Sequence, residues 1–250
     1  MLDLRLDPGG YPGTRCQALW PGHEYAQGWG VVARPFATGH VLALRVVRGS
    51  DIGSYRTLWH RDPELAWSIY VDGPRLDTAC PRYFGAACHH TGFGKLHLEW
   101  LDPATLSVRL ASPALDWVLT ATQTPLLRIL NAVNEALPRS TWGSAAVLHT
   151  RERVARALGM GAVPLRGVTP SGHLGTMMPQ RIYLISDTAA TLNGTEFGTP
   201  ARLRANPMIG DVPLPARGVL AIGQGVWEIL DPHENHLTRA ETSRGPQTIA

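Results

Sequence analysis

One short stretch of the chain, residues 54–72, carries several ionisable side chains beside its aromatic ones. There the order Ser-Tyr-Arg-Thr-Leu-Trp-His-Arg-Asp is followed a few residues later by Trp-Ser-Ile-Tyr-Val-Asp. Imidazole, phenol and carboxyl groups transfer protons near neutral pH when burial or a neighbouring charge shifts their pKa values. Such groups could catalyse hydration, cyclisation or isomerisation by acid–base chemistry. The candidate catalytic residues are His60, Asp62, Tyr70 and Asp72.

The pattern of this stretch predicts two strands joined by a loop that contains Asp62-Pro63, a common turn pair. Side chains alternate across a strand, so Arg56 and His60 share one face and adjoin the polar residues of the second strand. Two interpretations of this polar face remain open. It is either a polar patch inside a barrel or the solvent face of a half-buried hairpin.

The opposite face of the same hairpin is aromatic. Eight Trp residues occur in the chain, and several fall on candidate inward faces of strands. They either fill a core or line an apolar cavity of the kind that barrels enclose. The candidate ligand-binding residues are Tyr55, Arg56, Trp59, Trp67, Trp100 and Trp117.

Motifs for metals and nucleotides are missing or incomplete. The chain has no G-x-S-x-G elbow, no P-loop and no complete G-x-G-x-x-G. Cys80, Cys88, His89 and His90 could ligate a metal, but the two cysteines are too far apart for a zinc knuckle. We therefore predict no bound metal and no cofactor.

Composition limits the partners and the compartment. The formal charge is +3, and 22 of the 23 basic residues are arginines scattered along the chain, which does not predict a nucleic-acid surface. Three cysteines without a regular framework favour a reducing cytoplasm. We see neither a signal peptide nor an apolar run of membrane-spanning length. The Arg, Ala, Gly and Pro content is typical of a bacterial protein, and the oligomeric state stays open.

The elements that must position these residues are mainly strands. Alternating or β-branched runs predict strands at 41–48, 96–100, 106–110, 117–122, 163–168, 173–178, 181–187 and 218–230. Asn193-Gly194 is a hairpin signal. Gly223 and Gly225 mark sites either of a β-bulge or of close backbone approach. Residues 74–94 are expected to be irregular.

The apolar period changes to a helical one in the middle of the chain. Helices are expected at 125–137, where Thr124 can cap and Pro125 suits the first turn, and at 145–158. The first helix should pack on the sheet through an apolar stripe of Leu126, Ile129, Leu130, Val133 and Leu137.

Strands, then two helices, then strands predict a mainly β fold, either a large antiparallel β-barrel or a sandwich with a two-helix insertion. We expect one domain over residues 1–250. It comprises a first β half at 1–123, the helical insertion at 124–160, a second β half at 161–230 and a polar tail at 231–250.

The segments Trp59-His60-Arg61-Asp62 and Trp67-Ser68-Ile69-Tyr70-Val71-Asp72, together with the last strand Gly218–Leu230, resemble the lipocalin-like group that includes carotenoid 1,2-hydratases and AttH-like proteins. This resemblance implies a lipocalin-like barrel with a cavity, an isoprenoid- or polyketide-like substrate and proton-driven chemistry without a cofactor. It is architectural and transfers no catalytic residue.

The expected function is therefore the binding of a hydrophobic small molecule in a β-barrel cavity, with or without acid–base catalysis. A non-catalytic ligand carrier or sensor is the first alternative. A structural or interaction module with a filled core is the second. Ionisable groups that face a cavity distinguish an enzyme from a carrier, and the cavity itself distinguishes both from a module.

Overall fold

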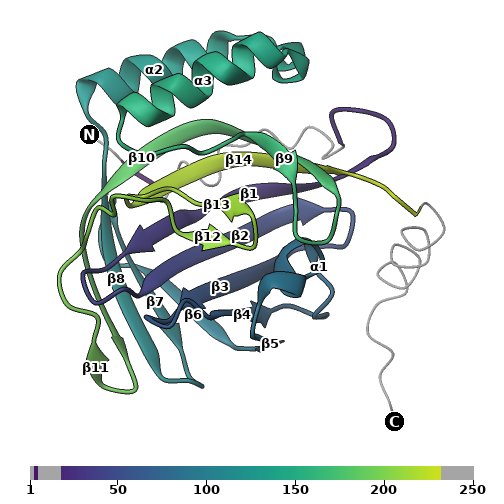
Figure 1. Ribbon diagram of the computed structural model, residues 1–250. Coiled ribbons are helices and arrows are strands. Elements are labelled where there is room, and N and C mark those ends of the chain that lie inside the picture. The colour runs from purple at the N-terminus through teal and green to yellow at the C-terminus, as the bar shows by residue number, and fades with distance from the viewer. Residues whose placement is uncertain (1–2, 5–17, 232–250) are drawn as a thin grey trace.

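The computed structural model describes residues 3–4 and 18–231, and these are organised around one large curled sheet (Figure 1). Its strands are β1 (His23–Pro35), β2 (Val41–Ser50), β3 (Tyr55–Arg61), β4 (Trp67–Asp72), β5 (His90–Phe93), β6 (Leu96–Trp100), β7 (Thr105–Leu110), β8 (Leu115–Thr122), β9 (Arg166–Val168), β10 (Leu174–Leu192), β11 (Thr195–Glu196) and β14 (Val219–Glu228). A separate small hairpin consists of β12 (Met208–Ile209) and β13 (Val212–Pro213). The helices are α1 (Ala79–Phe84), α2 (Pro125–Ala136) and α3 (Ala145–Ala157), with short 3-10 turns η2 (Gly85–Ala87) and η3 (Arg139–Gly143).

The strand order across the sheet is β5-β4-β3-β2-β1-β14-β10-β8-β7-β6, and β9 and β11 pair with β10. Neighbours are antiparallel except for β4 and β5. The two ends of the sheet approach each other, as two hydrogen bonds to Leu96 of β6 show. The Arg56 guanidinium of β3 donates to the Leu96 carbonyl oxygen at 3.3 Å, and the Leu96 N–H donates to the Asp72 carboxylate of β4 at 3.3 Å. The prediction of a mainly β, largely antiparallel fold with helices between two β regions is confirmed.

The curl gives the sheet an inner face, which looks into its interior, and an outer face. Large apolar side chains from both ends of the sheet meet on the inner face, among them Leu44, Leu106 and Trp117, all without exposed surface. The Trp117 indole donates a hydrogen bond to Thr188 Oγ1 at 2.8 Å, so the polar atom of this side chain is satisfied inside the core.

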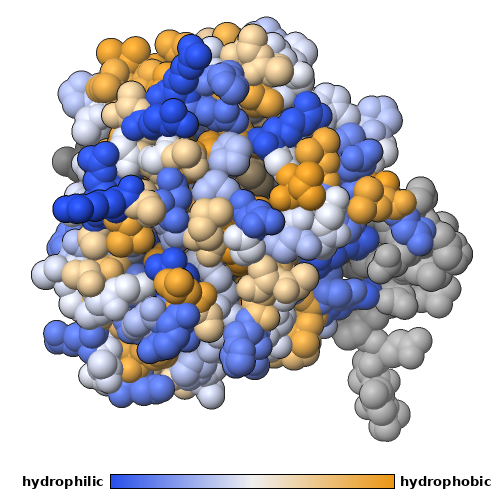
Figure 2. All heavy atoms as spheres, in the orientation of Figure 1, coloured by the Kyte–Doolittle hydropathy of each residue, from blue (hydrophilic) through white to orange (hydrophobic). Residues whose placement is uncertain are grey.

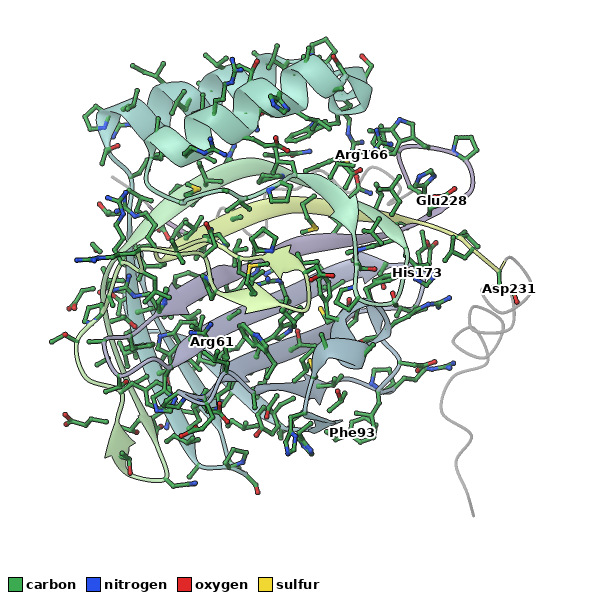
Figure 3. The ribbon with its side chains drawn as sticks, viewed as in Figure 1. Arg61, Phe93, Arg166, His173, Glu228 and Asp231 are labelled. Atoms are coloured by element: carbon green, nitrogen blue, oxygen red, sulfur yellow. The ribbon has the colours of Figure 1, made fainter. Side chains whose placement is uncertain are left out.

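The outer face carries the aromatic half of the predicted hairpin. Tyr55, Trp59 and Trp67 lie together there, as strand alternation predicts. The β12–β13 hairpin covers them, and the Trp67 indole donates to the carbonyl oxygen of Met208 at 2.7 Å. Helix α1 covers them as well, and its Tyr83 meets the ring of His173 edge on at 5.0 Å beside the helix (Figure 3).

The expectation of irregular structure at residues 74–94 is wrong, because this segment contains α1, η2 and β5. The six residues of α1 are too few for a helical period to be visible in the sequence. Burial of Ala79, Cys80 and Tyr83 against the outer face stabilises the helix in place of intrinsic propensity.

Strand β10 joins three elements that the sequence separates. It runs over 19 residues, from Leu174 to Leu192, and its register with β14 shifts between Pro179 and Arg181. Proline has no N–H to donate to the ladder, so the strand continues through an irregularity at this point. The hairpin predicted at Asn193-Gly194 is confirmed, with φ values of 50° and 81° that suit a tight turn.

The expected orientation of α2 is wrong. Leu127 and Asn131 face the sheet, whereas Leu126, Ile129 and Val133 are more than half exposed. Apolar surface is accordingly visible at the upper edge of the space-filling view, where α2 lies (Figure 2). Within the described part of the chain, no helix combines the length and the apolar character needed to cross a membrane.

Hydrogen bonds to the irregular part of β10 explain this orientation. The Asn131 amide donates to the carbonyl oxygen of Ile182 and accepts from the Ile182 N–H, both at 3.0 Å. One turn later, the Asn134 amide donates to the carbonyl oxygens of Pro179 and Gln180. Backbone groups that are left without ladder partners must be satisfied, so the asparagines, and not the apolar stripe, dock the helix.

Candidate functional site

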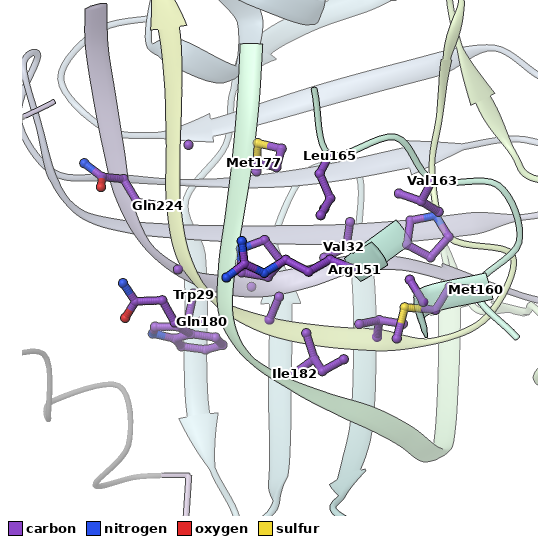
Figure 4. A pocket seen from close by; sticks show the side chains of 18 of the residues that line it. Trp29, Val32, Arg151, Met160, Val163, Leu165, Met177, Gln180, Ile182 and Gln224 are labelled. Atoms are coloured by element: carbon purple, nitrogen blue, oxygen red, sulfur yellow. The ribbon is translucent and has the colours of Figure 1, made fainter. Parts of the chain in front are cut away.

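A cavity of about 400 Å³ lies between the outer face of the sheet and the helices (Figure 4). Strands β1, β2, β10 and β14 form its floor, and α2 and α3 form its roof. The segments 160–165 and 212–215 close its sides. Most lining groups are apolar, including Val32, Met160, Leu165 and Ile182, which are drawn in Figure 4.

Small residues, which face each other across β1 and β14, form the central part of the cavity floor. On the cavity side, three successive cross-strand pairs consist only of Gly and Ala, namely Ala26–Gly225, Gly28–Gly223 and Gly30–Ala221. The alternate pairs on this part of the sheet include Trp29 with Ile222 and Val31 with Leu220. Adjacent strands therefore fill the inner side with large groups, while these positions on the outer side carry nothing larger than a methyl group.

Two of these glycines also allow a close backbone approach. A Cβ atom on Gly28 would overlap the carbonyl oxygen of Val46, and one on Gly30 would overlap that of Leu44. Both lie where the register between β1 and β2 shifts. Close approach was predicted from the sequence for Gly223 and Gly225, but the repeat of small residues at every second position of both strands was the stronger signal and was missed.

One charged side chain from the floor, Arg45 of β2, lines the cavity. Its Nη1 donates to the carbonyl oxygens of Val31 at 2.5 Å and Leu44 at 3.1 Å, and its Nη2 donates to that of Val32 at 3.2 Å. The guanidinium also lies 5.0 Å from the ring centre of Trp59. Burial lowers the pKa of Arg45, and an arginine nevertheless stays protonated at neutral pH.

Tyr55 and Cys80 line the same end of the cavity. Their polar atoms, the phenol oxygen and the thiol sulfur, are 4.0 Å apart. Burial raises the pKa of Tyr55 well above its ordinary value and also raises that of Cys80. Both side chains are thus neutral at physiological pH and offer an O–H and an S–H group without charge.

A second arginine lines the cavity from the roof. Arg151 of α3 stacks over Trp142 at 3.6 Å, donates to the Asn134 amide oxygen at 3.0 Å and donates to Thr141 at 3.2 Å. Its Nη1 is buried without a hydrogen-bond partner. Burial lowers its pKa. Figure 4 shows its guanidinium above the floor strands.

The predicted ligand-binding residues fall into two groups. Tyr55 and Trp59 line the cavity. Trp67 lies on the same face but is covered by the small hairpin. Arg56 pairs with Asp72 at the end of the sheet, at 3.7 Å. The remaining two, Trp100 and Trp117, belong to the packed inner face.

The predicted catalytic residues do not line the cavity, and the structure does not gather them around one point. His60 is hydrogen-bonded to the ring of His40 at 2.9 Å. Asp62 accepts from the Ala66 N–H within its turn. Tyr70 packs against the inner core and the ring of His90, and Asp72 binds Arg56 and Lys95. These contacts give each of the four a local structural role.

Possible metal ligands are dispersed as well. Cys80 is buried at the cavity, and Cys88 donates to the carbonyl oxygen of Phe84 at 3.4 Å. Over residues 3–4 and 18–231, no three His, Cys, Asp or Glu side chains are arranged to hold a metal ion.

Comparison of this chain with protein-family models, curated proteins and solved structures finds no match, so the geometry of the cavity is the basis on which its function can be inferred.

Proposed function

We propose that this protein binds a hydrophobic small molecule in the cavity between the outer face of the sheet and helices α2 and α3. The volume of about 400 Å³ falls within the range of small-molecule sites. The observation that carries the proposal is the bare floor of three Gly/Ala pairs beneath an apolar roof. Isoprenoid- and polyketide-like compounds suit such walls.

Binding without catalysis is the form of this function that the geometry favours. The acid–base candidates lie away from the cavity, with His60 and Tyr70 toward the inner side of the sheet. The ionisable groups that do line it near Arg45 are Tyr55 and Cys80, whose raised pKa values keep them protonated. A carrier or sensor requires only the apolar volume and a group that fixes orientation.

The proposal can be tested by filling the floor. Ala221 faces the cavity, so Ala221→Leu places a larger side chain in space that a ligand would occupy. Overpacking of roughly 1–3 kcal/mol corresponds to a loss of affinity of about five- to 150-fold. Ala157→Leu, on the exposed end of α3, is the matched control and should bind like the wild type.

Binding can be followed by tryptophan fluorescence, because Trp59, Trp142 and Trp227 line the cavity. Titration with farnesol and with a flat polyketide such as emodin should give saturable quenching, weaker in Ala221→Leu. The absence of saturable binding by apolar probes, or equal affinities in the two alanine variants, would contradict the proposal.

A further inference from the structure

We infer that the ligand of this cavity is an apolar carboxylic acid whose carboxylate binds the guanidinium of Arg45. This inference rests on the proposed function and names the ligand class. Arg45 is a cation on the floor of an otherwise mostly apolar cavity.

The hydrogen bonds of Arg45 leave donors free. A guanidinium has five N–H groups, and Arg45 uses three of them on the carbonyl oxygens of Val31, Val32 and Leu44. Both N–H groups of Nη1 are used, so one on Nη2 and the one on Nε remain. The Nε atom is also not among the fully buried polar atoms that lack a partner, so it keeps accessible surface. Nε and Nη2 form one edge of the guanidinium, and that edge suits the two oxygens of a carboxylate.

The charge of Arg45 is also not balanced. Carbonyl oxygens satisfy its donors but do not neutralise it, and no carboxylate of the described residues forms an ion pair with it. A buried cation is costly unless an anion accompanies it. Arg34, another buried arginine, differs in having the charge of Asp187 nearby. An anionic ligand would place beside Arg45 the negative charge that the described residues do not supply.

The surroundings favour a carboxylate at the end of an apolar body. Tyr55 is protonated, so its hydroxyl can donate a second hydrogen bond to the same anion. Trp59 and Phe84 lie beside Arg45 along the cavity wall, 5.1 Å apart between ring centres. Bare floor and apolar roof extend from there. The cavity thus combines a cationic site at Arg45 with walls for a hydrocarbon chain.

The test compares two ligands that differ only in the head group, dodecanoic acid and dodecan-1-ol, by tryptophan fluorescence at neutral pH. Charge-assisted hydrogen bonds predict that the wild type binds the acid roughly ten- to a hundredfold more tightly. Arg45→Gln should abolish this preference, because it weakens binding of the acid far more than binding of the alcohol. Arg48→Gln, an exposed arginine on the same strand, should behave like the wild type.

Two further measurements cover the case in which Arg45→Gln does not fold, since Arg45 also holds the β1–β2 irregularity. Tyr55→Phe should weaken binding of the acid severalfold, and more than it weakens binding of the alcohol. In the unaltered protein, the carbon-13 signal of carboxyl-labelled dodecanoic acid should show a bound carboxylate that stays ionised to a lower pH than the free acid.

The outcomes separate the two proposals. Equal affinities for acid and alcohol in the wild type, or a bound acid that protonates at or above the pH of the free acid, would overturn the role of Arg45 and leave hydrophobic binding intact. Failure of both ligands, and of the other apolar probes, to bind would overturn the proposed function as well.

Discussion

The imidazole rings of His40 and His60 form a hydrogen bond of 2.9 Å and stack with Phe197. Burial and, to a smaller extent, the charge of His40 lower the pKa of His60 to about 4, while the charge of Asp62 opposes this shift. The pKa of His40 is also lowered, mainly by burial. The pair is neutral at physiological pH, with one ring donating and the other accepting.

This pair makes stability depend on pH. The unfolded chain protonates its histidines near pH 6.5, whereas folded His60 does so near 4, so the unfolded state binds more protons between these values. The free energy of unfolding should therefore fall as the pH drops from about 6.5 to about 4, by up to about 3 kcal/mol. Urea denaturation across this range should show the loss. This loss of stability should be smaller in His60→Phe than in the wild type. In His89→Asn, an exposed control, it should equal that of the wild type.

At the scale of elements, α2 shows how a helix can present its apolar stripe outward. Its amide side chains occupy the contact with β10, and Leu127 alone of its leucines is completely buried. Val133 and Leu137 are exposed and also line the cavity. The outward stripe thus continues to the edge of the binding site.

Two adjacent leucines on α2 should respond very differently to truncation. Leu127→Ala removes a side chain packed with Met160, Leu184 and Val219 and should cost about 2–5 kcal/mol. Leu126→Ala, at an exposed position, should change stability by only about 0.5 kcal/mol. Urea midpoints measure both. Equal effects on stability would contradict this orientation of α2, in which Leu127 is buried and Leu126 is exposed.

Local features of the sequence were sufficient to predict most of the strands and turns. The strands, the Asn193-Gly194 turn and the shared face of Tyr55 and Trp59 follow from alternation and turn chemistry, which act over a few residues. The side of α2 that docks does not, because it depends on backbone groups of Pro179 and Ile182, which lie in the part of β10 between its pairing with β9 and its pairing with β8.

At the scale of the whole molecule, the sheet separates two compartments. Its curled interior is packed by large side chains such as Trp117, whereas the cavity lies on the outer face. The placement of the cavity could not be read from the sequence, because its floor requires residues 26–30 and 221–225 to become neighbours. Two strands that lie so far apart in the sequence leave no local pattern from which their pairing could be predicted.

The separation predicts that inner-face changes affect stability and not binding. Trp117→Phe removes the hydrogen bond to Thr188 and part of a filled core, at a cost of about 1–3 kcal/mol. Thr188 keeps its bond to the carbonyl oxygen of Val118, so no new buried donor is left unpaired. Thermal unfolding should show the loss, while farnesol titration should match the wild type. A weakened affinity would mean that the two faces are coupled.

The small residues of the floor also determine how this site could evolve. Gly28, Gly30 and Gly223 cannot gain even a methyl group, since a Cβ there would overlap the backbone of a neighbouring strand. Ala26 and Ala221 already carry one and face the open space. Divergent descendants of this chain could therefore adjust the length or girth of their ligand at the two alanines, while the glycines between them would stay invariant for reasons unrelated to the ligand.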